Sequence, residues 1–329
     1  MEYVYFGKSG LKVSRMALGL GLRDQHDEQG AERLIHRAVD KGITLFDCAN
    51  VYGLGDDRAY IGKSEEILGR ALKGKRDDVV ITSKVNQPIG EGPNDSRASR
   101  YHIMREVERS LRRLGTDHID VYLLHVFDEA TPLDEQFRAL DDLVRTGKIR
   151  YVGVCNYQAW QICLALNVQE RINASPLLTA QNPYSLLNRE LEREMFPFAR
   201  ATGVGIMAYA PLAIGLLSGA YRPGAPPQDS TLWARKTSGG LAAALNGRPG
   251  EVIRTVFAVA ERIGASVAQV ALQWVMTHPE ISVVITGADT AEQLDDNVAS
   301  VDLQLSADDT DALNRVSAED ESLRVVSIS

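Results

Sequence analysis

Eight short apolar segments recur along the chain, each about as long as a buried strand. Between them lie stretches whose apolar residues repeat at helical spacing. The segments are MALGL (16–20), ITLFD (43–47), DVVITSK (78–84), IDVYLLH (119–125), RYVGVCN (150–156), LLTAQN (177–182), VGIMAYA (204–210) and SVVITG (282–287). Continuously apolar strands are typical of parallel sheets that helices cover on their faces. Eight such units favour a closed (β/α)8 TIM barrel over an open sheet.

The intervening stretches carry helix signals of their own. Between residues 28 and 42, Ala31, Leu34 and Ile35 fall on one face, and Gly42 supplies a C-terminal stop. Further helices are expected at SEEILGRALKG (64–74), YHIMREVERSLRRLG (101–115), PLDEQFRALDDLVRTGK (132–148), ELEREMFPFARATG (190–203), EVIRTVFAVAERIG (251–264), SVAQVALQWVMTH (266–278), AEQLDDN (291–297) and SADDTDALNRV (306–316).

Two additions to the barrel are expected. Residues 3–15 (YVYFGKSGLKVSR) predict a β-hairpin that turns at Gly7–Gly10 and caps the barrel floor. A long loop rich in Pro, Gly and Ser follows the seventh strand, from Gly215 to about Gly250. Loops of this length inside a compact domain are usually functional lids or flexible segments. We find no linker, so residues 1–329 are expected to form one domain.

Charge and cysteine content narrow the class of protein. A net charge of −8 and a pI near 5.4 argue against nucleic-acid and anionic-membrane partners, which attract clustered Lys and Arg. No stretch approaches about 18 uninterrupted apolar residues, and the N-terminus lacks a basic segment followed by an apolar run. Cys48, Cys155 and Cys163 form an odd, widely spaced set without a metal-binding pattern. We therefore expect a cytoplasmic protein with reduced thiols and no metal.

Four polar residues lie where predicted strands end. Asp47, Lys84 and His125 close three strands, and Tyr52 lies five residues after Asp47. Active sites of (β/α)8 barrels lie at these C-terminal strand ends. The ammonium of Lys84 is expected to lower the pKa of Tyr52 from about 10, while Asp47 holds Lys84 in place. His125 would donate a hydrogen bond to a substrate carbonyl.

Each of the four residues alone would suit a structural role, such as a helix cap, loop packing or a core histidine. Together, at neighbouring strand ends, they predict a proton-donating site for the reduction of an aldehyde or ketone.

Long segments of the chain match a known family in order. They are GITLFDCANVYG, SEEILGRAL, ITSKV, DVYLLH, LDDLVRTGKIRYVGVCNY, QNPYSLLNRELEREMFPFAR and AYAPLAIGLLSG. In these segments the chain resembles the aldo-keto reductase superfamily, in the branch that includes Shaker-type potassium channel β subunits and many bacterial reductases. The resemblance implies that Tyr52 is the general acid, Lys84 tunes it, Asp47 is the partner of Lys84, and His125 orients the substrate.

The resemblance also implies a nicotinamide cofactor, bound extended and without a Rossmann motif. Indeed, GLGL (19–22) lacks the third glycine of that motif. Asn156 and Gln181 match residues that hold the nicotinamide carboxamide, and Tyr209 matches the ring stacked on the nicotinamide. The remaining cofactor-binding positions are Leu212, Gly215 and Leu217 in the segment that wraps the pyrophosphate, and Gly287, Asp289, Gln293 and Asn297 toward the adenine and its ribose.

The chain departs from the family where the ribose is expected. Asp289 stands where relatives that prefer the 2′-phosphorylated cofactor often have Ser or Arg, and a carboxylate there favours NAD(H). Arg235 or Lys236, in the long loop, would supply the missing positive charge. On family grounds we expect NADP(H) slightly ahead of NAD(H).

The expected pocket mouth also differs from the family pattern. The loop GLGDDRAYIGKSEE (53–66) is longer than usual, and Val126 and Phe127 follow His125. Candidate lining residues are Tyr60, Phe127, Trp160 and Trp233. Two other functions stay open: an NAD-dependent sugar or polyol dehydrogenase, supported by Asp289 and by Asp56, Asp57 and Arg58, and a cofactor-sensing binding protein. The sequence indicates neither the physiological substrate nor the oligomeric state.

Overall fold

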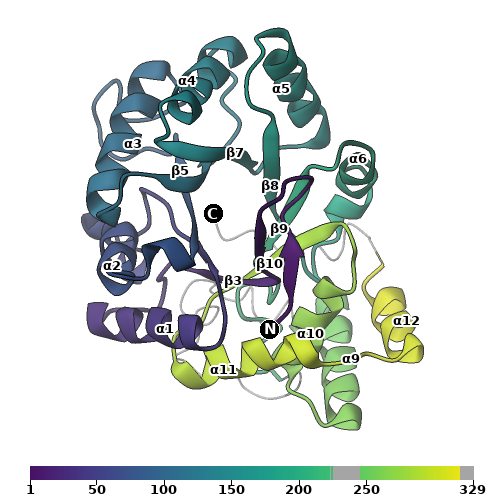
Figure 1. The fold of residues 1–329 in the computed structure, drawn as a ribbon. Helices are drawn as coiled ribbons and strands as arrows, with labels where there is room; N and C mark the ends of the chain where they lie inside the picture. The colour runs from purple at the N-terminus through teal and green to yellow at the C-terminus, as the bar shows by residue number, and fades with distance from the viewer. Residues whose placement is uncertain (223, 225–244, 319–329) are drawn as a thin grey trace.

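The computed structural model describes residues 1–222, 224 and 245–318, and in this part of the chain eight parallel strands close into a barrel (Figure 1). The ring order is β10-β3-β4-β5-β6-β7-β8-β9, and β10 pairs with β3 to close it. The strands are β3 Met16–Gly19, β4 Leu45–Asp47, β5 Val80–Val85, β6 Ile119–Leu124, β7 Ile149–Cys155, β8 Leu177–Pro183, β9 Gly205–Tyr209 and β10 Ile281–Thr286. The predicted (β/α)8 barrel is therefore confirmed.

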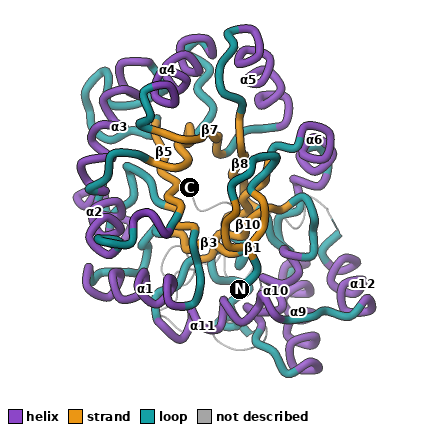
Figure 2. The backbone as a smooth tube through the Cα atoms, in the orientation of Figure 1, coloured by secondary structure: helices purple, strands orange, loops and turns teal. Residues whose placement is uncertain are grey.

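Burial on both faces explains why these strands are apolar throughout. All six residues of β5 are buried. One set of side chains fills the barrel interior, including Ala17, Leu45 and Met207. Alternate side chains point outward into a larger core beneath the helices. Figure 2 shows this arrangement as a ring of strands inside a layer of helices.

Within the described ranges, the helices follow the predicted pattern with one exception. They are α1 Glu28–Asp40, α2 Lys63–Ala71, α3 Arg100–Leu114, α4 Leu133–Arg145, α5 Ala159–Arg171, α6 Met195–Thr202, α9 Arg248–Ile263, α10 Val267–Met276, α11 Ala291–Ala299 and α12 Ala307–Val316. Helix α5 was not among those expected. Its outward face carries exposed Trp160, Cys163 and Leu164 opposite its buried face, so no apolar stripe stands out in the sequence.

Two other boundaries differ from the prediction. The expected helix over 190–203 is a short 3-10 turn, Glu190–Glu192, followed by α6. Helix α9 begins at Arg248, three residues before the expected start. Much of the predicted long loop, including Trp233, Arg235 and Lys236, lies outside the described residues. The expectation of one domain over residues 1–329 stays a prediction.

The N-terminal hairpin covers the floor of the barrel, as predicted. Strands β1 Tyr3–Tyr5 and β2 Lys12–Ser14 pair antiparallel, with Tyr3 opposite Ser14. Phe6 and Val13 are fully buried against the side chains of the barrel interior. Gly7 has a φ of 56°, and a Cβ there would lie 2.7 Å from the carbonyl oxygen of Leu178, near the start of β8. The hairpin thus closes the end of the barrel away from the predicted site.

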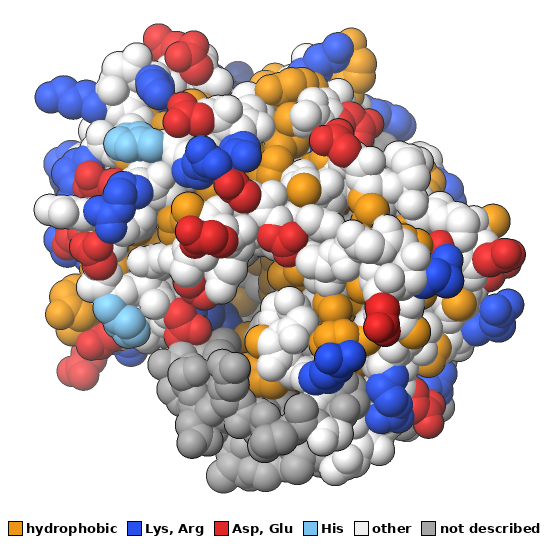
Figure 3. Space-filling view, turned by 90° about the horizontal axis from the view of Figure 1, so that it is seen from below, with side chains coloured by type: hydrophobic (Ala, Val, Ile, Leu, Met, Phe, Trp, Pro, Cys, Tyr) orange, Lys and Arg blue, Asp and Glu red, His pale blue; other side chains and the backbone are white. Residues whose placement is uncertain are grey.

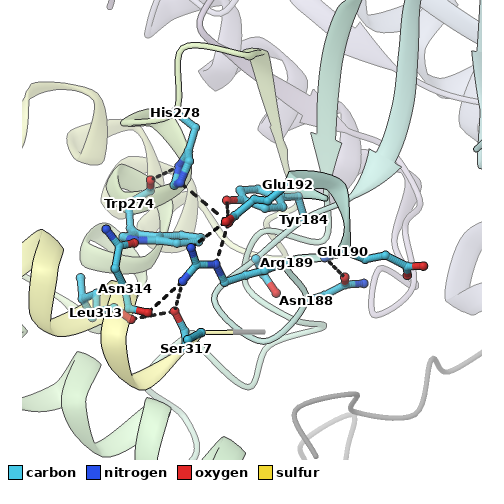
Figure 4. A network of polar contacts seen from close by, with 12 residues as sticks. Tyr184, Asn188, Arg189, Glu190, Glu192, Trp274, His278, Leu313, Asn314 and Ser317 are labelled. Carbon is cyan, nitrogen blue, oxygen red and sulfur yellow. Dashed lines mark hydrogen bonds and ion pairs between the residues drawn. The ribbon is translucent and has the colours of Figure 1, made fainter. Parts of the chain in front are cut away.

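A half-buried polar network fixes the loop after β8 to α10 and α12 (Figure 4). The guanidinium of Arg189 binds both carboxylate oxygens of Glu192 at 2.6 and 2.7 Å, and also donates to the backbone oxygen of Asn314 at 3.0 Å. The ring of Trp274 stacks on Tyr184, and its indole nitrogen donates to the side chain of Asn314. A bidentate, charge-assisted pair of this kind holds geometry well, so the network joins α12 to the barrel wall.

No single helix within the described ranges is both long and apolar enough to cross a lipid bilayer. Taken together, α9 and α10 are long and apolar enough to do so, but the two helices meet at a bend of 101°. Their apolar residues, including Val256 and Trp274, are buried in the protein core.

Candidate active site

The four predicted catalytic residues come together at the C-terminal end of the barrel. Asp47 is the last residue of β4, Lys84 lies at the end of β5, and His125 directly follows β6. Tyr52 is in the loop after β4, where its backbone oxygen accepts from the amide of Ser64 at the start of α2. Three adjacent strands of the ring therefore supply the four side chains.

Lys84 and Asp47 form a buried ion pair. The Nζ of Lys84 donates to Oδ2 of Asp47 at 2.7 Å and to the backbone oxygen of Cys48 at 2.9 Å. The Oδ1 of Asp47 accepts from Oγ1 of Thr82 at 2.5 Å and from Nε2 of Gln181 at 2.8 Å. Burial is the largest single influence and lowers the pKa of Lys84, but the charge and hydrogen bond of Asp47, together with Tyr52 and Cys155, outweigh it and raise that pKa. Lys84 is therefore charged at neutral pH.

Tyr52 lies against both Lys84 and His125. The Nζ of Lys84 is 4.7 Å from the centre of the Tyr52 ring, and the ring meets the imidazole of His125 edge-on at 5.7 Å. Burial raises the pKa of Tyr52 to about 12; Lys84 opposes this rise, while Asp47 adds to it. The expected lowering of this pKa was wrong, because the loss of hydration exceeds the attraction of an ammonium that Asp47 already neutralises. The phenol is thus a protonated donor at neutral pH.

His125 is a neutral imidazole. Its backbone amide donates to Oδ1 of Asn86 at 3.0 Å, and the left-handed φ of 88° at Asn86 lets that side chain turn back beneath the histidine. Burial, with a smaller contribution from Lys84, lowers the pKa of His125 to about 3. Its Nδ1 is buried without a hydrogen-bond partner in the described part of the chain. A neutral imidazole at the barrel end has one nitrogen that donates and one that accepts, which suits contact with a polar ligand atom.

The lowered pKa of His125 predicts a loss of stability in acid. Below pH 6.5 the unfolded chain binds a proton that the folded protein does not bind until near pH 3. Between pH 6.5 and 5 this difference should lower the free energy of unfolding by about 2 kcal/mol. Urea unfolding at pH 6.5 and at pH 5 measures this fall. In the H125Q variant the free energy of unfolding should fall by about 2 kcal/mol less than in the wild type. Equal losses in the two proteins would refute the assignment, since other buried histidines contribute to both.

The residues predicted to hold a nicotinamide lie on β8 and β9 or directly after β7. These strands lie across the barrel from the Lys84–Asp47 pair on β4 and β5. The hydroxyl of Tyr209 donates to Oδ1 of Asn156 at 2.7 Å, and Nδ2 of Asn156 donates to the backbone oxygen of His125 at 3.0 Å. Gln181 bonds Asp47 as described. The structure therefore joins the predicted nicotinamide-binding residues to the catalytic residues in one hydrogen-bonded group.

A cavity of about 560 Å³ opens over the ends of β3, β9 and β10. Gly19 in its wall pairs with Asp47, but none of the predicted catalytic or nicotinamide-binding residues lines it. The predicted residues that line it are Leu212, Gly215, Gly287, Asp289, Gln293 and Asn297. Leu217 does not line it: its side chain is fully buried, and its amide donates to the backbone oxygen of Leu212. On the face shown in Figure 3, acidic and basic side chains are interspersed rather than gathered into a field of one sign.

Sequence reasoning missed the loop after β3 as part of the cavity wall. Leu20, Gly21, Leu22, Arg23 and Asp24 all line the cavity. The available signal was the pair of glycines in GLGL: Gly19 ends β3 and Gly21 follows it, although their spacing does not fit a Rossmann motif. A Cβ at Gly21 or Gly287 would meet no atom of the described residues within 4 Å, so these residues leave the backbone there open to a ligand.

These features fit a nicotinamide dinucleotide. The volume lies within the range of about 300–1,000 Å³ that is usual for small-molecule and cofactor sites. Open glycine backbone and the start of α11 beside the cavity suit a phosphate group. Within the described residues, no group of three or more His, Cys, Asp or Glu side chains could hold a metal ion.

The chain matches a family model and several known proteins over most of its length. The model of the aldo/keto reductase family matches residues 15–318. An uncharacterized oxidoreductase of Bacillus subtilis is 38% identical over 328 residues, covering 96% of each chain. A probable voltage-gated potassium channel subunit beta of Arabidopsis thaliana is 34% identical over 312 residues, covering 92% of each chain. The L-glyceraldehyde 3-phosphate reductase of Escherichia coli is 35% identical over 312 residues, covering 92% of this chain and 88% of that enzyme.

Proposed function

The chain belongs to the aldo/keto reductase family and is an oxidoreductase, and we propose that it reduces the carbonyl group of a small aldehyde or ketone with a bound NAD(P)H. Tyr52 donates the proton, and the reaction is reversible. The observation that carries this proposal is the buried Lys84–Asp47 pair directly beside Tyr52 and His125 at the barrel end.

Each of the four side chains has a different role in the proton transfer. When bound, the reduced nicotinamide supplies a hydride to the carbonyl carbon. The neutral imidazole of His125 orients the carbonyl oxygen, and the protonated phenol of Tyr52 gives that oxygen its proton. The charge on Lys84, 4.7 Å from the ring, stabilises the phenolate that the transfer leaves behind. Asp47 keeps Lys84 charged and in place.

Residues around the cavity would hold the cofactor. Asn156, Gln181 and Tyr209 are proposed for the nicotinamide end, because they lie beside the catalytic group. Gly215, Gly287 and Asn297 line the cavity where the pyrophosphate and adenosine would extend, together with Leu212, Asp289 and Gln293. The buried side chain of Leu217 would pack in the core beneath the segment that is proposed to wrap the pyrophosphate.

Steady-state assays of the purified protein test this function. Consumption of NADPH or NADH, followed by absorbance, is expected with some members of a panel of aldehydes and ketones. Oxidation of sugars or polyols with NAD⁺, without reduction of carbonyls, would instead support the dehydrogenase alternative, whose basis is Asp289 and the polar loop with Asp57 and Arg58. Cofactor binding without any turnover would support a cofactor-sensing binding protein, as the similarity to a channel β subunit suggests.

Replacing Asp289 with serine is expected to favour the 2′-phosphorylated cofactor. The exposed Asp289 lines the cavity next to the first turn of α11. A carboxylate there binds a ribose 2′-hydroxyl and repels a 2′-phosphate. D289S should therefore tighten NADPH binding about tenfold, which corresponds to about 1.4 kcal/mol, and weaken NADH binding. Quenching of tryptophan fluorescence measures both affinities, and an unchanged NADPH-to-NADH ratio would show that Asp289 does not select the cofactor.

We propose that the protein is located in the cytoplasm. Cys48, Cys155 and Cys163 are all free thiols, and the first two are buried. Free thiols are usual in reducing compartments.

A further inference from the structure

A chain of side-chain hydrogen bonds crosses the mouth of the barrel through a cysteine. It starts at Asp47 on β4, whose Oδ1 accepts from Nε2 of Gln181 on β8. The Oε1 of Gln181 accepts from the thiol of Cys155, the last residue of β7, at 3.4 Å. The Sγ of Cys155 accepts in turn from Nδ2 of Asn156 at 3.3 Å, and Oδ1 of Asn156 accepts from the hydroxyl of Tyr209. We call these five residues the relay.

The relay spans the barrel rather than following its wall. In the ring order, β4 and β8 are separated by four steps in an eight-stranded ring, so the bond from Gln181 to Asp47 joins opposite strands. Cys155 lies directly opposite Gln181 in the β7–β8 register. It is therefore placed to bind the amide that reaches across to Asp47.

The charge on Asp47 sets the direction of every bond in the relay. A carboxylate only accepts, so Gln181 must turn its NH₂ group toward Asp47 and its oxygen toward Cys155. That oxygen needs a donor, because Gln181 is only 2% exposed. The thiol supplies it, which leaves the sulfur to accept from Asn156. Burial raises the pKa of Cys155 to about 12, although Lys84 opposes the rise, so the thiol keeps the proton that it donates.

We propose that Cys155 is a positioning residue, whose thiol fixes the amides of Gln181 and Asn156 in the orientation that serves both Asp47 and a bound nicotinamide. The proposal rests on the proposed cofactor. Without the thiol, the oxygen of Gln181 loses the donor that the described residues give it, and the amide is held only on the side of Asp47. Asn156 also loses one of the two acceptors that hold its NH₂ group inward and its oxygen toward Tyr209.

Two substitutions at this one position separate hydrogen bonding from packing. C155S keeps a donor and an acceptor but is smaller, whereas C155V fills the space, being larger by about one methyl group, but can make neither bond. If the thiol acts by positioning, serine replaces it and valine does not. If it acts only by filling space in the barrel interior, valine replaces it and serine leaves a void.

Cofactor affinity is the first readout, measured by tryptophan-fluorescence titration with NADPH and with NADH. We expect C155S to keep the wild-type dissociation constant within about threefold and C155V to raise it about tenfold or more, equivalent to about 1.4 kcal/mol. Wild-type affinity in C155V would overturn the proposal. So would equal weakening in both variants, because a serine hydroxyl restores the bonds that valine lacks.

Unfolding without cofactor is the second readout and does not depend on the proposed function. In a double-mutant cycle of C155V with D47A, which removes the acceptor that Gln181 binds, the two changes are expected to be non-additive, because both act on Gln181. Additive effects would overturn the relay. If the wild-type protein binds neither nucleotide, the proposed function fails, while this cycle still decides whether Cys155 and Asp47 are coupled.

Discussion

Replacing Tyr52 with phenylalanine is expected to lower kcat for carbonyl reduction by about 10²–10⁴-fold, the usual contribution of a general acid. The substitution removes one oxygen atom and keeps the ring. The edge-on contact with His125 and the approach of Lys84 to the ring, at 5.7 and 4.7 Å, involve the ring itself. Lys84 keeps its bonds to Asp47 and to the backbone of Cys48. The loss should therefore fall on the chemical step.

Two measurements check this prediction. Single-turnover reduction by the purified variant gives the chemical rate, and a fluorescence titration gives the affinity for NADPH and NADH. We expect the affinities to stay within about threefold of wild type, since the cavity lies over other strands. A variant that retains more than about a tenth of the wild-type rate would exclude Tyr52 as the proton donor.

The raised pKa of Tyr52 adds a prediction about pH to the same experiment. With a pKa of about 12 the phenol stays protonated through neutral and mildly alkaline pH, so its donor form is not the limiting species there. Reduction by the wild type should therefore show no decline from loss of this proton below about pH 11. Oxidation of an alcohol needs the phenolate and should speed up as the pH rises. A reductive rate that falls with an apparent pKa near 8 would show that Lys84 outweighs burial once the cofactor is bound.

The sequence predicts the barrel well because its signals are local. Apolar runs bounded by turn residues mark the strands, and Gly7 marks the turn of the hairpin, where a side chain would meet the backbone of Leu178. Asp47, Lys84 and His125 could be selected because a strand end has a known position in a barrel. Helix α5 was not predicted, because its exposed residues Trp160 and Leu164 are also apolar. The sequence therefore shows no clear helical period of apolar residues there.

The electrostatics of the site depend on contacts that sequence spacing does not record. The lowering of the Tyr52 pKa was expected from Lys84 alone, whereas the structure adds burial and a neutralising carboxylate. Asp47 and Gln181 are 134 positions apart and lie on opposite strands, so their bond depends on closure of the barrel. Leu217 was assigned to the cofactor from its place in a matching segment, and only packing shows that its side chain faces the core.

Replacing Lys84 with methionine is expected to affect both catalysis and stability. Lys84 is fully buried, and its removal leaves the carboxylate of Asp47 buried with Thr82 and Gln181 as its side-chain donors among the described residues. An uncompensated buried charge costs about 3–5 kcal/mol, which urea unfolding at neutral pH should show. The reductive rate should fall by about 10²–10³-fold or more, because no cation stabilises the phenolate of Tyr52.

A second substitution separates the two effects of K84M. Adding D47N removes the stranded charge while keeping a side chain that can still bond with Gln181 and Thr82. The double variant K84M/D47N should regain at least about 2 kcal/mol of the lost stability, since a neutral amide costs less to bury than an unpaired carboxylate. Its reductive rate should stay as low as that of K84M. Recovery of activity together with stability would mean that Lys84 only holds the fold, and that Tyr52 works without it.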